Sequence, residues 1–425
     1  MSSNLQSIRG MHDIVPADIG EWQRLEAAVR AVFAQYGYSE IRVPVVEKTE
    51  LFSRSIGVAT DVVDKEMYTF EDRNGDLLSL RPEGTAGVVR AVLQNGLLYA
   101  APLRLWYQGP MFRRERPQKG RTRQFHQVGA EVFGAPGPDV DAELLLMCRR
   151  LWGMLGLDGL TLELNSLGSA DERAAYRDTL QAWLLDHAEQ LDKDTLERAR
   201  SNPLRVLDSK DPAVQELLAD APLLDDVLGE ESRAHFAGVC AVLDQAGQAY
   251  TLNPRLVRGL DYYSHTVFEW TTRELGAQGT VCAGGRYDGL VELLGGKPWP
   301  GIGWALGQER VVELMKQAGG SAAPAPHCYM VLAGDEAGQA GLALAERLRD
   351  ALPALRIECN AAGGSFKAQF KRADRSGARL ALVLGEDELA RREITIKPMR
   401  RDTDQQQVHM DSLAAWLERW LAERT

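Results

Sequence analysis

The chain has 425 residues, which is more than one hydrophobic core usually supports, so we expect two or three domains. Hydrophobic residues make up 45% and charged residues 26%, a balance that excludes a largely disordered protein. The formal net charge of -11 excludes a protein that coats nucleic acid without specificity, because such binding depends on clustered Lys and Arg. Any contact with nucleic acid must therefore be local.

Cysteine spacing and hydropathy favour the cytoplasm. The five cysteines are far apart, and none forms the CxxC spacing of a zinc site or redox pair, which indicates a reducing compartment. The amino terminus, MSSNLQSIRGMHDIVP, lacks the apolar stretch of a signal peptide. No run elsewhere approaches the roughly 18 apolar residues of a membrane span. We therefore expect a cytoplasmic protein without a membrane segment, zinc or an organic cofactor.

The first elements along the chain predict a helix followed by strands. Apolar residues recur every three or four positions from Ile19 to Tyr36, which predicts one amphipathic helix. Residues 41–47, IRVPVVE, follow as a strand. Residues 103–133 have strand-like stretches on both sides of a basic loop, 113–123, and predict two antiparallel strands.

The middle of the chain, residues 168–248, is rich in Ala, Leu, Asp, Glu and Arg. It predicts several short helices, broken at Pro203, Pro212 and Pro222. Strands are expected again over 250–273 and 279–283, and a helix over 302–318. We interpret residues 168–248 as a helical insertion into a discontinuous domain that comprises residues 1–167 and 249–318.

The last quarter of the chain predicts a second domain. Residues 319–326 combine Gly, Ser, Ala and Pro without periodicity, which is typical of an interdomain linker. Strands and helices then alternate through residues 327–425 and end in a helix from Asp411, which indicates an α/β layer structure. The predicted fold class is α/β: an α+β first domain on an antiparallel sheet, a helical insertion and a terminal α/β domain.

Residues 113–123 stand out because they are basic in an acidic chain. They hold six Lys or Arg against one Glu. Charge alone favours a solvated loop. The alternative is a phosphate site, because an Arg guanidinium matches the oxygens of phosphates and carboxylates.

Other segments carry candidate residues, each with a structural alternative. Pro82 and Glu83 suit a helix start, yet a carboxylate there can equally bind an amine. The segment LVRGLDYYSHTVFEW, from Leu256, holds either an Arg–Asp pair with core aromatics or a ligand site. AGGRYDGL, from Ala283, is either a plain turn or a close approach of backbone to a ligand. In GIGWALGQER the glycines permit close packing of helix on sheet, and Arg310 is either a surface charge or a phosphate anchor.

Taken together and in order, these segments resemble the class II aminoacyl-tRNA synthetases. The strand containing Pro44 looks like the family's first motif, at a dimer interface; WYQGPMFRRERPQKGRTRQFHQVGAEVFG looks like the second, and GIGWALGQER like the third. LVRGLDYYSHTVFEW and AGGRYDGL resemble two segments characteristic of the histidine-specific members. The terminal domain is similar to the anticodon-binding domain of the histidine, proline, threonine and glycine enzymes.

The resemblance implies roles for individual residues. Those expected to bind histidine are Glu83, Gly84, Thr85, Arg113, Gln127, Glu131, Arg258, Tyr262, Tyr263 and Tyr287. Those expected to bind ATP are Arg113, Glu115, Arg121, Phe125 and Arg310, with Phe125 stacked on adenine. Arg113, Arg258 and Arg310 are the expected catalytic residues, because fixed cations stabilise the charge that develops on the α-phosphate.

The resemblance also implies partners and a reaction. We expect a homodimer that joins histidine to tRNA(His) through histidyl-adenylate, with ATP as substrate and Mg²⁺ on the diphosphate. Gln118 and Arg123 are candidate contacts to the acceptor end of the tRNA. One rival is the inactive regulatory paralogue of ATP phosphoribosyltransferase, which lacks the anticodon-binding domain and usually loses catalytic arginines. A proline or threonine enzyme is a second rival, which the two histidine-type segments disfavour.

Overall fold

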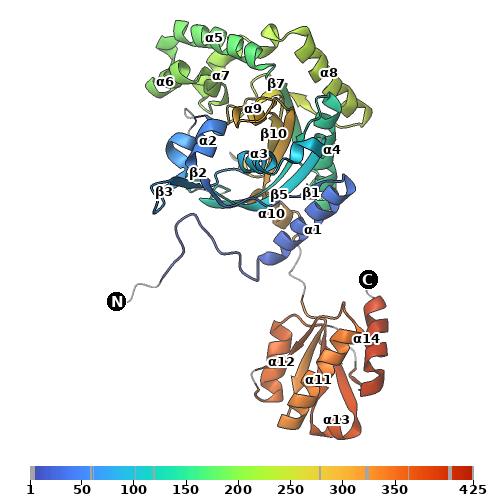
Figure 1. Cartoon of the computed structure of the whole chain (residues 1–425). Coiled ribbons are helices and arrows are strands. Elements are labelled where there is room, and N and C mark those ends of the chain that lie inside the picture. The colour runs from blue at the N-terminus through green and yellow to red at the C-terminus, as the bar shows by residue number, and fades with distance from the viewer. Residues whose placement is uncertain are drawn as a thin grey trace. The chain divides into compact units, whose positions relative to one another are not determined.

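The computed structural model describes residues 5–57, 60, 62–100, 102–117, 120–276, 279–320, 325–361, 363–400 and 404–423. The chain forms two compact units, Met1–Ser321 and Ala322–Thr425 (Figure 1). The division falls inside the segment 319–326 that resembles a linker, of which residues 321–324 lie outside the described part. None of the described helices is long and apolar enough to cross a membrane.

The first unit is built on an eight-stranded sheet with the order β1-β5-β6-β11-β10-β9-β7-β8. Its strands are β1 Ser39–Glu40, β5 Leu103–Phe112, β6 Gln124–Phe133, β7 Thr161–Ser166, β8 Thr251–Leu252, β9 Ser264–Thr271, β10 Thr280–Arg286 and β11 Gly301–Gly307. The six inner strands pair antiparallel, and the short edge strands β1 and β8 pair parallel. The antiparallel pair predicted within 103–133 is confirmed as β5 and β6.

One face of this sheet carries an apolar core under α1 Ile19–Gln35, α4 Pro138–Leu155 and α10 Gln308–Gln317. The predicted amphipathic helix is confirmed as α1, whose buried residues include Trp22 and Leu25. On β6 the core residues alternate along the strand: Val128, Ala130 and Val132. Because side chains in a strand alternate between faces, Gln127, Gly129 and Glu131 point to the opposite face.

That opposite face is covered by α3 Thr85–Gln94 and α9 Leu290–Leu293, on which α2 Thr49–Ile56 packs, and α3 lies across the face in Figure 1. The helices of the segment 168–248 are α5 Ala170–Asp186, α6 Lys193–Ser201, α7 Pro212–Leu217 and α8 Glu230–Gln245, and α8 packs on α4. Short helical turns lie at Val62–Glu66, Leu97–Ala100, Ala188–Gln190, Pro203–Asp208, Leu218–Asp220, Leu224–Val227 and Met410–Ser412.

A second, three-stranded antiparallel sheet has the order β2-β4-β3, from Val46–Lys48, Leu77–Leu80 and Tyr68–Glu71. The strand predicted over 41–47 is therefore wrong for most of its length, since only its last two residues lie in β2. Residues 41–45 have no regular structure. Pro44 has no N–H to donate to a neighbouring strand, which explains the interruption.

One further prediction fails at the third motif, and another holds only in part. Residues 302–307 form strand β11 rather than the start of the predicted helix, which begins only at Gln308. Ile302, Trp304 and Leu306 alternate with small residues, which is the period of a strand. In the segment from Ala283, residues 283–286 belong to β10, and the turn considered for it occurs only over residues 287–290, where the N–H of Leu290 donates to Tyr287 O at 3.0 Å.

The second unit is a five-stranded sheet with the order β13-β12-β14-β15-β16. The strands are β12 Cys328–Leu332, β13 Ile357–Cys359, β14 Leu380–Leu384, β15 Glu393–Pro398 and β16 Gln406–His409, of which the first three are parallel. Helices α11 Asp335–Ala351 and α14 Leu413–Ala422 cover one face, and α12 Phe366–Arg375 covers the other. The mixed α/β class is confirmed, although α13 Glu386–Arg391 and β16 were not foreseen.

Candidate functional site

A buried carboxyl group, that of Glu131 on β6, lies on the sheet face opposite α1 and α4. Its side chain is only 1% exposed. Oε1 accepts a hydrogen bond from Thr85 Oγ1 at 2.7 Å, and Oε2 accepts one from the hydroxyl of Tyr287. The carboxyl is thus held from two sides by residues that are 46 and 156 positions away in sequence.

Glycines of β11 make the space for this group. Gly303 lies directly opposite Glu131, and a Cβ at residue 303 would lie 1.8 Å from Glu131 Oε2. A Cβ at Gly301 would lie 2.5 Å from Cε2 of Tyr287. The interpretation that these glycines serve packing of helix on sheet is therefore wrong, because they leave room for the acid and the phenol ring.

The start of α3 places a second buried carboxylate nearby. Glu83 is 4% exposed, and its two oxygens accept the backbone N–H groups of Thr85 at 2.6 Å and Ala86 at 2.9 Å. The helix-start position predicted for Glu83 is confirmed. Gly84 approaches Tyr107 so closely that a Cβ would lie 2.2 Å from its ring, and Gly129 does the same from β6.

Burial perturbs both acids. It raises the pKa of Glu131 to about 8, although the hydrogen bonds from Tyr287 and Thr85 act in the opposite direction. Burial also raises the pKa of Glu83, against the hydrogen bonds donated by the backbone of Ala86 and Thr85. Around neutral pH the Glu131 carboxyl therefore retains a proton, so it can donate as well as accept a hydrogen bond.

We expect Glu131→Gln to stabilise the fold increasingly as the pH rises. The folded-state pKa of about 8 exceeds the ordinary value of 4.5, so the folded protein binds this proton more tightly than the unfolded chain. Stability contributed by the protonated group is complete at low pH and is lost as the pH rises toward 8. Calorimetric Tm values of both proteins between about pH 5 and pH 8 test this, and a pH-independent difference would contradict it.

Aromatic rings and Arg258 form the adjoining wall. The rings of Tyr262 and Tyr263 lie 4.6 Å apart, and that of Tyr262 meets Tyr287 edge-on at 5.7 Å. The Arg258 guanidinium lies 5.8 Å from the centre of the Tyr263 ring. Its ion pair is with Glu269 on β9, so the Arg–Asp pair considered from the sequence is wrong. Burial lowers the pKa of Arg258, but the Glu269 carboxylate together with Tyr263 and Tyr262 outweighs it, so the net shift is upward.

Gln127 offers an unused acceptor on the same sheet face. Its Oε1 is buried and has no hydrogen-bond partner among the described residues. Buried polar atoms are normally paired, so such an atom indicates a position where a ligand donor can bind.

Several of the predicted ATP-binding residues gather around the basic loop. Arg113 Nε donates to Pro82 O at 2.9 Å, and its guanidinium lies 5.4 Å from the centre of the Phe125 ring. Glu115 pairs with Arg121 at 3.0 Å. Arg310, on α10, donates to Gly120 O at 3.3 Å and to Thr280 O, so the loop is tied to that helix.

The loop is therefore more than a solvated charge run. Arg123 donates from Nε to Glu115 O at 3.3 Å, and its backbone N–H donates to Gly10 O at 2.6 Å. Arg123 thus fastens the loop to the amino-terminal segment. Gln118, the other predicted tRNA contact, lies outside the described residues.

Sequence reasoning missed three residues of this region. Arg81, 5% exposed, donates to Val43 O at 3.0 Å and to Pro110 O at 2.8 Å. Tyr107 sits between the glycines described above, and Glu269 holds Arg258. For Tyr107 and Glu269 the alternation of their strands was an available signal, whereas nothing local to the sequence marked the partners of Arg81.

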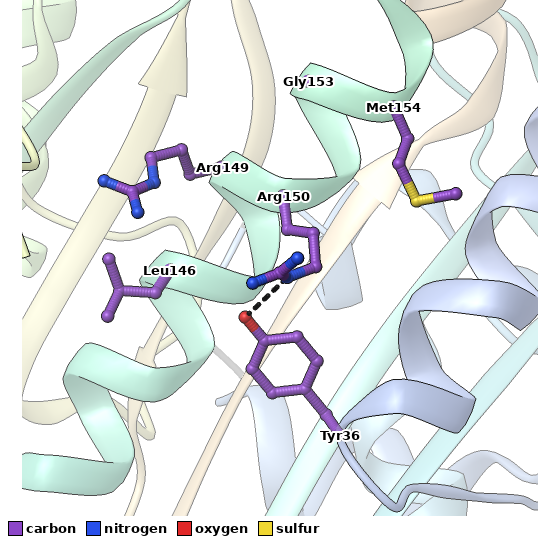
Figure 2. A pocket seen from close by; sticks show the side chains of 6 residues that line it. All are labelled: Tyr36, Leu146, Arg149, Arg150, Gly153 and Met154. Atoms are coloured by element: carbon purple, nitrogen blue, oxygen red, sulfur yellow. Dashed lines mark hydrogen bonds between the residues drawn. The ribbon is translucent and has the colours of Figure 1, made fainter.

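A surface hollow occurs elsewhere on the first unit, where α1 ends beside α4 (Figure 2). Its lining residues are Tyr36, Leu146, Arg149, Arg150, Gly153 and Met154. Arg150 Nε donates to the Tyr36 hydroxyl at 3.4 Å. The residues that line this hollow include no carboxyl group, so we place the candidate active site at Glu83, Glu131 and the neighbouring arginines.

This site, set on an antiparallel sheet and followed by a separate α/β unit, defines the architecture of a class II aminoacyl-tRNA synthetase. Residues 10–311 match the family model for histidyl-tRNA synthetase, and residues 327–420 match that for an anticodon binding domain. The chain belongs to the histidyl-tRNA synthetase family.

Solved structures agree with this assignment. The apo histidyl-tRNA synthetase of Staphylococcus aureus is 34% identical, with a TM-score of 0.81 over 97% of this chain and 99% of that one. The fold is shared with the histidyl-tRNA synthetase of Nostoc, at 22% identity and a TM-score of 0.72 over 98% of this chain and 100% of that one. It is also shared with an ATP phosphoribosyltransferase regulatory subunit/histidyl-tRNA synthetase from Bacillus halodurans, at 22% identity and a TM-score of 0.66 over 91% of this chain and 99% of that one.

Proposed function

We propose that the chain is an active histidine–tRNA ligase. It forms histidyl-adenylate and diphosphate from histidine and ATP, then transfers the histidyl group to the 3′-terminal adenosine of tRNA(His). The observation that carries the proposal is the Glu131 carboxyl, buried and held by Thr85 and Tyr287. A neutral imidazole has one donor and one acceptor nitrogen, which a carboxyl and a phenol hydroxyl can match.

The rest of the amino acid is assigned to the residues around Glu131. Glu83, Thr85 and Gln127 bind the α-amino group, and the unpaired Oε1 of Gln127 supports this. Tyr262 and Tyr263 enclose the imidazole. The backbone of Gly84, just before the start of α3, is assigned to histidine as well. A site with such buried polar groups rejects apolar amino acids by roughly 10⁴-fold or more, because they would leave these groups unpaired.

ATP is assigned to the side where Arg113, Phe125 and Arg310 gather, with Glu115 and Arg121 beside them. Phe125 stacks on adenine, and Arg310 binds the γ-phosphate. A histidine carboxylate oxygen attacks the α-phosphorus in line, and the bond from that phosphorus to the departing diphosphate breaks. Arg113 and Arg258 stabilise the negative charge that develops there.

Mg²⁺ is expected to arrive with the nucleotide. Among the described residues no group of three or more His, Cys, Asp and Glu is arranged to hold a metal ion. Mg²⁺ commonly takes most of its ligands from phosphate oxygens and water, so the ATP phosphates can supply what the side chains do not. The ion would neutralise charge on the departing diphosphate.

Amino-acid-dependent ATP–diphosphate exchange tests the proposal. We expect exchange with histidine and with none of the other nineteen amino acids. Histidine binding without exchange would instead identify a regulatory paralogue. The name of the Bacillus halodurans protein includes such a regulatory subunit. The matched anticodon-binding domain and the presence of Arg113, Arg258 and Arg310 favour the active enzyme. Exchange with proline would overturn the specificity.

The partners are tRNA(His) and a second copy of the chain, in the cytoplasm. Arg123 and Gln118 are assigned to the acceptor end of the tRNA, where Arg and Gln can contact an exposed base edge. Charging of tRNA(His) by Arg123→Ala, with exchange as the control, tests this assignment.

We expect a homodimer of twice 46.9 kDa at micromolar concentration. One face of the sheet β2-β4-β3 carries Val46, Tyr68, Phe70, Leu78 and Leu80, with Lys48 among them, because the strand register places them together. Val46 is 39% and Phe70 46% exposed, so this mostly apolar face is open to a partner. In sedimentation, Phe70→Asp should give a monomer. A wild-type monomer would contradict the proposal.

A further inference from the structure

Glu269 lies beside the proposed active site, where it forms an ion pair with Arg258. In the sheet register Glu131 faces Gly303, Gly303 faces Gly285, and Gly285 faces Val267. Glu269 is two residues beyond Val267 on β9, so its side chain points to the same face as Glu131. Its carboxylate is 17% exposed and pairs through Oε1 with Nη1 of Arg258.

The second carboxylate oxygen of Glu269 is also engaged. Oε2 accepts a hydrogen bond from Thr280 Oγ1 at 2.8 Å. The backbone carbonyl of the same Thr280 accepts a hydrogen bond from Nη1 of Arg310. Arg258 and Arg310 are thus linked through one pair of residues, Glu269 on β9 and Thr280 on β10.

This arrangement leaves one edge of Arg258 available. Its Nε is buried and has no hydrogen-bond partner among the described residues. A guanidinium has five N–H donors in a rigid planar fork, so fixing one side by a carboxylate orients the other side. A long side chain that is already oriented stabilises a transition state without first losing its rotational freedom.

We propose that Glu269, held by Thr280, is a positioning residue that orients Arg258 and sets its spacing from Arg310 for adenylate formation. The inference rests on the proposed function. Glu269 itself acts through Arg258 and contacts neither histidine nor the nucleotide.

The test compares Glu269→Gln with wild type in histidine-dependent ATP–diphosphate exchange. We expect kcat to fall by about 10- to 100-fold, because the orientation of Arg258 matters most when charge develops at the α-phosphate. The KM values for histidine and ATP should change by less than about threefold. A drop in binding with unchanged kcat would overturn the proposal.

Glu163→Gln is the matched control. Glu163 faces Glu269 directly from β7, on the same side of the sheet, but it accepts from Asn253 at 2.7 Å and Thr271 at 3.1 Å instead of from an arginine. The Glu163→Gln variant should retain near-normal exchange. Equal losses in the two variants would show that any acid-to-amide change on this face disturbs the sheet, and the proposal would fail.

Thr280→Val gives an independent variant if Glu269→Gln does not fold. Valine removes the hydroxyl that holds Glu269 and keeps the carbonyl that accepts from Arg310. We expect a smaller loss of kcat, about fivefold, and near-normal activity for Thr280→Ser. Full activity of Thr280→Val would contradict the proposed role of this residue.

Combining substitutions decides whether Glu269 works through Arg258. In an Arg258→Ala background, Glu269→Gln should cost little further activity, because the group that it positions is absent. If the losses of the two single variants multiply in the double variant, Glu269 acts independently of Arg258. If added Mg²⁺ restores the activity of Glu269→Gln, Glu269 acts as a metal ligand. Absence of exchange in wild type would refute the proposed function instead.

Discussion

Replacing Arg258 with alanine should reduce the rate of histidyl-adenylate formation by about 10² or more, which corresponds to about 3 kcal/mol. The guanidinium is oriented by Glu269 and lies against the Tyr263 ring, next to the proposed histidine pocket. Its charge would be removed from the point where negative charge grows during attack on the α-phosphate. Single-turnover adenylate formation and ATP–diphosphate exchange measure the effect.

Arg258→Lys serves as the comparison for this prediction. Lysine keeps the charge but lacks the planar fork that pairs with Glu269 while presenting a second edge. We expect an activity between those of wild type and the alanine variant. A folded Arg258→Ala protein with near-normal exchange would remove Arg258 from the proposed mechanism.

Glu131→Gln should lower the kcat/KM for histidine by about 10² or more and leave the KM for ATP nearly unchanged. The amide keeps the shape of the carboxyl, but its NH2 group cannot accept the hydrogen bond that Thr85 or Tyr287 donates to the acid, so the side chain is no longer held for the imidazole. Wild-type histidine affinity should also fall above about pH 8, where Glu131 loses its proton. That alkaline decline should be reduced in the variant.

Tyr287→Phe is the graded control for Glu131. It removes only the hydroxyl that donates to Oε2 of Glu131 and should cost about 1 to 3 kcal/mol in histidine use. Tyr263→Phe should cost less, because no hydrogen bond joins the Tyr263 hydroxyl to Glu131 among those of the described residues. If either substitution raised the KM for ATP and spared histidine kinetics, these tyrosines would be assigned to the wrong substrate.

Local periodicity allowed the regular elements to be predicted where one face is buried. Helix α1 matches its apolar pattern to within one residue, and β5 and β6 were expected on either side of the basic loop. Strand β11 was mistaken for a helix because its glycines hid the alternation. Those glycines make room for Glu131 and Tyr287, which approach β11 from other parts of the chain.

The candidate site was identified from the sequence by resemblance, whereas its internal contacts required the fold. The nearest acid to Arg258 in sequence is Asp261, yet the partner is Glu269, eleven residues away, because the chain turns into β9 between them. Thr85 was expected to bind a ligand, and its hydroxyl also holds Glu131. Such pairings join residues up to 156 positions apart, which no local pattern encodes.

The missing side chain at Gly303 constrains how this pocket can diverge. A Cβ there would lie 1.8 Å from Glu131 Oε2 and 2.4 Å from the backbone oxygen of Ala130, so position 303 accepts only glycine, whichever side chain stands at position 131. A shift toward another amino acid must therefore change the side chains around this gap, above all Glu131 and Tyr287, while the glycine stays. Because Tyr287 also holds Glu131, a change in either one lowers the use of histidine before a new substrate is accepted.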